Sequence, residues 1–166
     1  MRKKLALLAV TASLALSAAA PPALPITDLK QLPIVVQAPY DENANADAVV
    51  DAAFARAKKS HRLVMLDLGG NWCPDCIILA NVMQLPAMKK FMAQHYEFAS
   101  VDVGRFDKNL QVPAKFGYTE RLKGVPTILV ATPEGKLVND GHVFALTDAR
   151  NMTPQSLAAY LAQWAK

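Results

Sequence analysis

The sequence predicts an α/β fold in which a mixed β-sheet is flanked by helices and preceded by an extended N-terminal leader. Short apolar runs typical of strands alternate with segments of helical periodicity along most of the 166 residues. Their order is helix, strand, helix, then strand and helix, then two strands and a final helix. Residues 1–44 lack this alternation. We therefore divide the chain into a signal peptide at 1–20, a leader at 21–44 and one domain at 45–166.

Residues 1–20 have the pattern of a secretory signal peptide. Arg2, Lys3 and Lys4 precede an apolar run at 5–16, and small residues follow at 17–20. The run is shorter than the ~20 residues that span a bilayer, and no second long apolar run follows it. We therefore expect cleavage, a periplasmic location and no stable membrane insertion.

The charge balance argues against a nucleic-acid-binding protein. The whole chain has 18 Lys and Arg against 14 Asp and Glu. Without the three cations of the signal peptide, 15 basic residues face 14 acidic ones, a net charge of about +1. A charge this small provides no basic surface for a nucleic acid.

We also expect the protein to be a monomer.

The leader and the first helix follow from proline content and periodicity. Five prolines lie between 21 and 40, which disfavours a helix and favours an extended segment, with 34–36 as a candidate edge strand. Asn45 is a candidate N-cap for a helix that ends near Ser60. Apolar residues at 46, 49, 50, 53 and 54 give this helix a buried stripe.

The remaining elements alternate along the domain. Residues 63–68 are apolar apart from Asp67, as in a strand covered on both faces. A helix is expected from 73 to 85, and Pro86 kinks or restarts it before 88–94. Strands are expected at 98–103 and 127–131, a short helix at 109–116, a return strand at 136–138, and a last helix after Thr153-Pro154. Met65, Met83, Met88 and Met92 are expected to fill the core.

Cys73 and Cys76 are the only cysteines, and they lie where a buried strand gives way to a helix. A disulfide between residues so close would constrain the unfolded chain little, so a reactive pair is the better interpretation. Unpaired N–H groups and the helix dipole at a helix N-terminus favour the thiolate, which makes Cys73 the expected nucleophile. Cys76, about one helical turn further, is placed to resolve a mixed disulfide.

Three features of the chain resemble the thioredoxin superfamily. These are Trp72-Cys73-Pro74-Asp75-Cys76 at a strand-to-helix turn, Asp67 six residues before the first cysteine, and Gly124-Val125-Pro126-Thr127 before an apolar strand. The resemblance covers about 47–166. It implies a thioredoxin-like fold and an exported thiol-disulfide oxidoreductase whose redox-active group is the Cys73–Cys76 disulfide, with no other cofactor.

The resemblance also implies a role for each matched residue. Asp67, desolvated in its strand, is expected to take the proton of Cys76. Pro126 is expected to be cis, and the backbone of Val125 to pair with an extended substrate chain. Trp72, Pro74 and Asp75 are expected at the substrate surface. The charge of Asp75 should oppose the Cys73 thiolate and make the protein more reducing.

The preferred hypothesis is a reductase of protein disulfides that is recharged by a thiol-reducing membrane protein. A disulfide oxidase or isomerase remains an alternative. A second class, a copper-delivery module without enzymatic activity, would use the two cysteines and a histidine. His61, His95 and His142 are scattered without ligand spacing, so no metal site is expected. The segment 141–153 is a candidate rim of the substrate groove.

Overall fold

The computed structural model describes residues 19–165, so all but the last two residues of the predicted signal peptide lie outside the described part. Three strands form one sheet in the order β2-β1-β3. β1 (Leu63–Gly69) runs parallel to β2 (Tyr96–Asp102) and antiparallel to β3 (Thr127–Ala131). The predicted mixed sheet is confirmed, and the central strand β1 leads directly into the cysteine segment.

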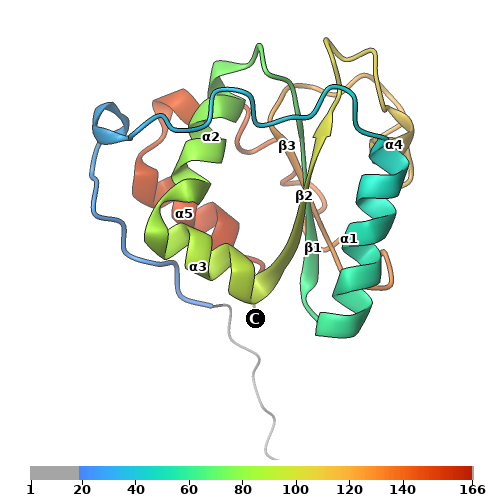
Figure 1. Ribbon diagram of the computed structural model, residues 1–166, viewed down its shortest axis with the longest axis horizontal. Coiled ribbons are helices and arrows are strands. Elements are labelled where there is room, and N and C mark those ends of the chain that lie inside the picture. The colour runs from blue at the N-terminus through green and yellow to red at the C-terminus, as the bar shows by residue number, and fades with distance from the viewer. Residues whose placement is uncertain (1–18, 166) are drawn as a thin grey trace, which may run out of the picture.

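Helices cover both faces of this sheet (Figure 1). α1 (Ala46–Ser60) and the short α4 (Gln111–Ala114) lie on one face. α2 (Pro74–Gln84), α3 (Pro86–His95) and α5 (Pro154–Ala162) lie on the other. Helices on both faces bury both sides of β1, which explains its nearly continuous apolar sequence. Within residues 19–165, no helix has the length and apolar character needed to cross a membrane.

Alternate residues of β1 serve two separate cores. Val64, Leu66 and Leu68 pack with α1, whereas Met65 packs with α2, α3 and α5. Side chains along a strand alternate between its faces, so Asp67 and Gly69 share the face of Met65. The expectation that four methionines fill the core is confirmed, since all are buried: Met65, Met83, Met88 and Met92.

Residues 21–44 run extended around the α2 side of the molecule and over its upper end, interrupted by a single 3-10 turn at Leu29–Gln31 (Figure 1). The predicted edge strand at 34–36 is wrong. The N–H groups of Val35 and Val36 both donate to Asn81 Oδ1, at 2.7 and 2.9 Å, and Asn81 Nδ2 donates to the Val36 carbonyl. A helix side chain thus satisfies backbone groups that a strand would have paired with a neighbour.

The predicted return strand at 136–138 is reduced to one antiparallel bridge, between Leu137 and Ala131. The Thr132 N–H donates to the Lys136 carbonyl at 2.9 Å, and the Val138 N–H donates to the Val130 carbonyl at 2.8 Å. Asn139 ends the pairing. Its Oδ1 accepts from the Val130 N–H at 2.9 Å, and its Nδ2 donates to the Ile128 carbonyl at 2.8 Å. The side-chain amide therefore occupies the hydrogen-bonding groups of β3 that a longer strand would have used.

The helix boundaries agree closely with the predictions except at 109–116. Asn45 caps α1 through a 3.1 Å bond from the Ala48 N–H, and a new helix starts at Pro86. The helix predicted at 109–116 is reduced to α4, a single turn at Gln111–Ala114. Pro113 lacks a backbone donor, and Asn109 adopts a left-handed conformation with φ 53°.

Candidate redox-active site

Cys73 and Cys76 form a disulfide at the start of α2. Cys73 is the N-cap residue, and its Sγ accepts from the Cys76 N–H at 3.2 Å. The two Cα atoms are 5.3 Å apart, within the range that a disulfide allows. The predicted placement at a strand-to-helix turn is confirmed. A thiolate at Cys73 would meet an N–H group and the positive end of the helix dipole.

The loop before β3 lies against the disulfide. The carbonyl oxygen of Val125 is 3.5 Å from Cys73 Sγ, and the Val125–Pro126 peptide bond is cis, as predicted. Cys76 is fully covered, whereas Cys73 keeps a small exposed area. An approaching disulfide would therefore meet Cys73 and the Val125 backbone together.

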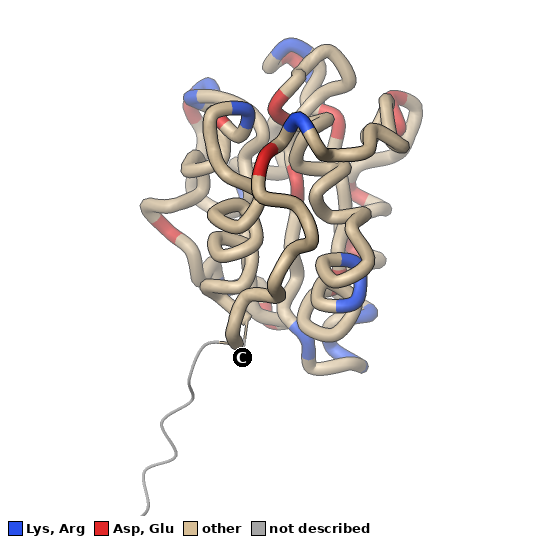
Figure 2. The backbone as a smooth tube through the Cα atoms, turned by 90° about the vertical axis from the view of Figure 1, so that its left-hand side faces the viewer, with Lys and Arg blue, Asp and Glu red and all other residues tan. Residues whose placement is uncertain are grey.

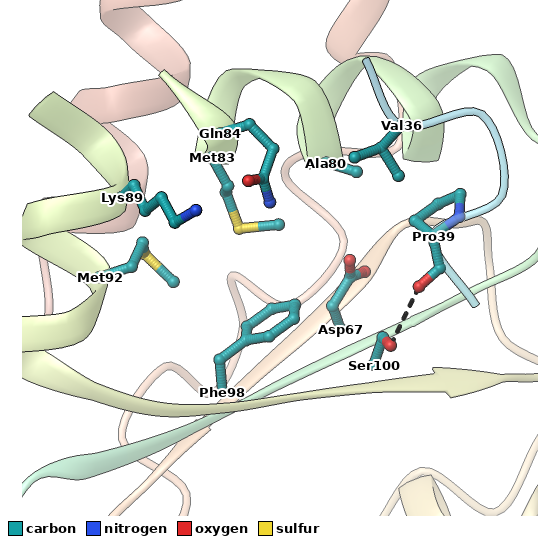
Figure 3. A pocket seen from close by; sticks show the side chains of 10 residues that line it. All are labelled: Val36, Pro39, Asp67, Ala80, Met83, Gln84, Lys89, Met92, Phe98 and Ser100. Carbon is teal, nitrogen blue, oxygen red and sulfur yellow. Dashed lines mark hydrogen bonds between the residues drawn. The ribbon is translucent and has the colours of Figure 1, made fainter. Parts of the chain in front are cut away.

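Asp67 is 1% exposed beneath this pair, so the expected desolvated carboxyl is confirmed. Burial raises its pKa from 3.8 to about 7, and a hydrogen bond from Tyr40 opposes part of that rise. The carboxyl also borders a cavity of about 210 Å³ between β2 and the helices α2 and α3. Figure 3 shows Phe98 and Ser100 on one side of this cavity and Met83 and Lys89 on the other.

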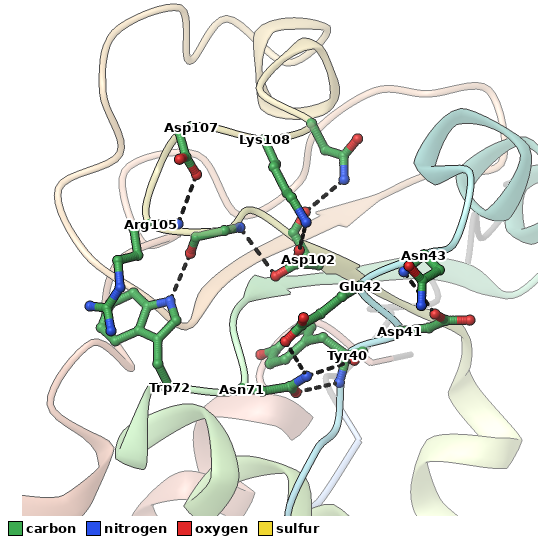
Figure 4. A network of polar contacts seen from close by, with 12 residues as sticks. Tyr40, Asp41, Glu42, Asn43, Asn71, Trp72, Asp102, Arg105, Asp107 and Lys108 are labelled. Carbon is green, nitrogen blue, oxygen red and sulfur yellow. Dashed lines mark hydrogen bonds and ion pairs between the residues drawn. The ribbon is translucent and has the colours of Figure 1, made fainter.

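Tyr40 was not predicted as a site residue. Its hydroxyl donates to Asp67 Oδ1 at 2.9 Å, and its side chain is buried. Asn71 holds the Tyr40 backbone from both sides, accepting from its N–H at 3.0 Å and donating to its carbonyl at 2.9 Å (Figure 4). Glu42 accepts from the same Asn71 amide group at 2.9 Å. Residues of the N-terminal segment are thus part of the site.

Trp72 and Pro74 lie at the surface beside the sulfur pair. Trp72 is 40% exposed, and its Nε1 donates to the Gly104 carbonyl at 2.7 Å (Figure 4). The guanidinium of Arg105 lies 4.9 Å from the centre of the indole ring, and Phe106 packs edge-on against it. These contacts fix an aromatic and cationic rim next to Cys73.

Asp75 does not lie at the substrate surface as expected. It is 2% exposed, and its carboxylate pairs with the Arg150 side chain. The Arg150 backbone N–H also donates to Asp75 Oδ1 at 2.8 Å. The argument that Asp75 opposes the Cys73 thiolate therefore fails, because Arg150 compensates its charge. The segment 141–153 supplies this arginine, and its Thr147 packs against Gly124 of the proline loop.

The chain belongs to the thioredoxin-like family, whose model matches residues 45–133. It is 30% identical over 114 residues to the thiol:disulfide interchange protein DsbD 1 of Pseudomonas aeruginosa, a match that covers 67% of this chain but only 18% of that protein. It is also similar to the crystal structure of a disulphide isomerase from Xylella fastidiosa Temecula1. That likeness has a TM-score of 0.70 and 33% identity, and covers 75% of this chain and 95% of the other.

The surroundings of the site carry both signs of charge. In Figure 2, blue and red segments both occur at the upper end of the tube, whereas most coloured segments at its lower end are blue. Among residues 19–165, no group of three or more His, Cys, Asp or Glu is arranged to hold a metal ion. His61 is the C-cap residue of α1, and His142 packs beside Trp164. Neither histidine forms a cluster of metal ligands with the sulfur pair.

Proposed function

We propose that this protein is an exported thiol-disulfide oxidoreductase that reduces disulfide bonds in other proteins. The observation that supports this most is the cysteine pair at the start of α2, with a buried carboxyl beneath it and the Val125 carbonyl beside the first sulfur. Export rests on the signal-peptide pattern of residues 1–20.

The reaction has two exchange steps. The Cys73 thiolate attacks one sulfur of the substrate disulfide, forms a mixed disulfide and releases the other substrate sulfur as a thiolate. Cys76 then loses its proton to the carboxylate of Asp67 and attacks Cys73 Sγ. This attack breaks the mixed disulfide, frees the second substrate thiol and leaves the protein in its oxidised Cys73–Cys76 form.

The reductive direction is supported by Asp67. When ionised, this buried carboxylate disfavours a second negative charge on the neighbouring sulfurs. It therefore destabilises the reduced, thiolate-bearing pair relative to the disulfide, which lowers the reduction potential. A thiol-reducing membrane protein would have to return two electrons after each turnover.

The direction is tested by the reduction potential and by turnover of a protein disulfide. We expect a potential near the roughly −270 mV of thioredoxin, whereas a value near about −120 mV would indicate an oxidase. The Cys76→Ala variant should retain substrates as mixed disulfides on Cys73, and the matched Cys73→Ala variant should retain none. Equal trapping by both variants would contradict the assigned order of attack.

An isomerase is the second candidate, favoured by the structural likeness to the Xylella disulphide isomerase. An isomerase would restore the activity of a protein with scrambled disulfides without a net supply of electrons. A reductase would reduce the same protein without restoring its activity. Comparing the two rates on one scrambled substrate separates these functions.

A further inference from the structure

The phenol of Tyr40 lies close to both the buried carboxyl and the second sulfur. The space beside Gly69 is occupied by both groups. A Cβ atom built on Gly69 would lie under 3.0 Å from the Tyr40 hydroxyl oxygen and from Cys76 Sγ. The same hydroxyl oxygen is 2.9 Å from Asp67 Oδ1. The hydroxyl is therefore a direct partner of the carboxyl and a close neighbour of the sulfur.

The geometry of β1 separates the two groups that must exchange a proton. Residues 67 and 69 point to the same face of the strand, about 6.6 Å apart along it. Cys76 Sγ lies over Gly69, one such step beyond Asp67. The Tyr40 hydroxyl lies near the position over Gly69 while it is bonded to Asp67. A hydroxyl can accept one proton and donate another, so this one can carry a proton between the two groups.

We propose that the Tyr40 hydroxyl relays the proton of the Cys76 thiol to Asp67 during resolution of the mixed disulfide. This inference rests on the proposed function. The S–H proton passes to Tyr40 Oη while the phenolic proton passes to Asp67 Oδ1, so Tyr40 ends the step neutral. The Cys76 sulfur keeps the electron pair and forms the bond to Cys73 Sγ, and the substrate sulfur leaves with the pair of the broken bond.

The surrounding groups suit this role. Burial and the neighbouring Asp67 charge raise the pKa of Tyr40 well above its ordinary value, so the phenol stays protonated and ready to donate. The other titratable groups nearby are Cys73 at the N-cap of α2, Glu42, which shares the Asn71 amide with the Tyr40 backbone, Asp102 at the end of β2, which pairs with Lys108, and Lys89 on α3 at the cavity (Figure 3). The cavity beside Asp67 gives the carboxyl a route for returning its proton to water.

Tyr40 is held firmly enough to act as a relay. Its backbone is bonded on both sides by Asn71, and the preceding Pro39 carbonyl accepts from the Ser100 hydroxyl at 3.1 Å. Two strands of the sheet and the turn after β1 therefore position one phenol. Tyr40→Phe would keep the ring in this position and remove only the hydroxyl.

The test follows the two steps separately. The reduced protein is mixed with a chromogenic aromatic disulfide, so that attack by Cys73 releases one coloured thiol and resolution by Cys76 releases the second. We expect Tyr40→Phe to leave the first phase unchanged and to slow the second about a hundredfold, at the lower end of what acid–base catalysis contributes. Tyr96→Phe is the matched control, since it removes another buried hydroxyl bond, to the Leu161 carbonyl.

Two further measurements make the result decisive. Asp67→Asn should slow the second phase, and adding it to Tyr40→Phe should cause little further loss, because both act in one transfer. In the oxidised protein, Tyr40→Phe should raise the pKa of Asp67 measured by carboxyl-carbon NMR, since the tyrosine bond lowers it.

An unchanged second phase in Tyr40→Phe, or slowing that multiplies in the double variant, would overturn the relay while leaving the proposed function intact. Absence of a second phase in the wild-type protein would instead refute the exchange reaction itself.

Discussion

Replacing Asp67 with Asn should stabilise the folded protein, and the gain should grow with pH. Burial raises the pKa of Asp67 from 3.8 to about 7. Between these two values the folded state keeps a proton that the unfolded chain has released, so the free energy of unfolding falls as pH rises. Below pH 3.8, Asp67 has no effect on the free energy of unfolding. The loss of stability is complete once the pH is above about 7.

The size of this effect follows from the shift. Each pKa unit corresponds to about 1.36 kcal/mol, so the full penalty is roughly 4 kcal/mol. Integrating the titration gives a loss of about 2 kcal/mol at pH 5 and about 4 kcal/mol at pH 8. Asn keeps an oxygen that can accept from Tyr40 but removes the charge. The stability advantage of Asp67→Asn over the wild type should therefore increase by about 2 to 3 kcal/mol over this interval.

Guanidinium unfolding of the oxidised proteins at the two pH values measures this difference. Asp51→Asn, which removes one exposed carboxyl on α1, is the control. Parallel stability curves for the wild type and Asp67→Asn between pH 5 and pH 8 would refute the reasoning, because they would mean that Asp67 titrates alike in the folded and unfolded states.

Three other changes test the surroundings of the sulfur pair. Arg150→Gln leaves the buried Asp75 carboxylate without its cation, so we expect a stability loss of about 1 to 3 kcal/mol that Asp75→Asn in the same chain largely restores; no restoration would exclude the ion pair as the cause. Gly69→Ala forces a methyl group against Tyr40 and should cost about 1 to 3 kcal/mol in chemical unfolding; a neutral result would show that the phenol can move aside. Asn81→Ala should accelerate hydrogen exchange of the backbone amides at 35 and 36 without altering the sheet; unchanged exchange there would mean that other contacts hold the segment.

Local patterns predicted much of the fold and the centre of the site. The Cys73–Cys76 spacing, the helix start at Pro74 and the strand that carries Asp67 are all encoded in a few consecutive residues. Hydrophobic periodicity and caps report such features directly. The three strands and the restart of the helix at Pro86 were therefore predictable.

Contacts between distant segments were not predictable in this way. Tyr40 meets Asp67 across 27 residues, and Arg150 meets Asp75 across 75 residues. Nothing in the local sequence distinguishes this tyrosine or this arginine from a surface residue. The strand predictions at 34–36 and 136–138 overestimated the backbone pairing for a related reason. Asn81 and Asn139 each use a side-chain amide in place of a backbone partner.

The position of Tyr40 in the chain has a consequence for comparing relatives. The part that defines membership of the family spans 45–133, yet this phenol stands ahead of it and the arginine bound to Asp75 stands after it. Two homologues can therefore share the sequence WCPDC and still differ in the residues that contact Asp67 and Asp75. Ranking such enzymes by reactivity requires aligning the flanking regions as well as the shared centre.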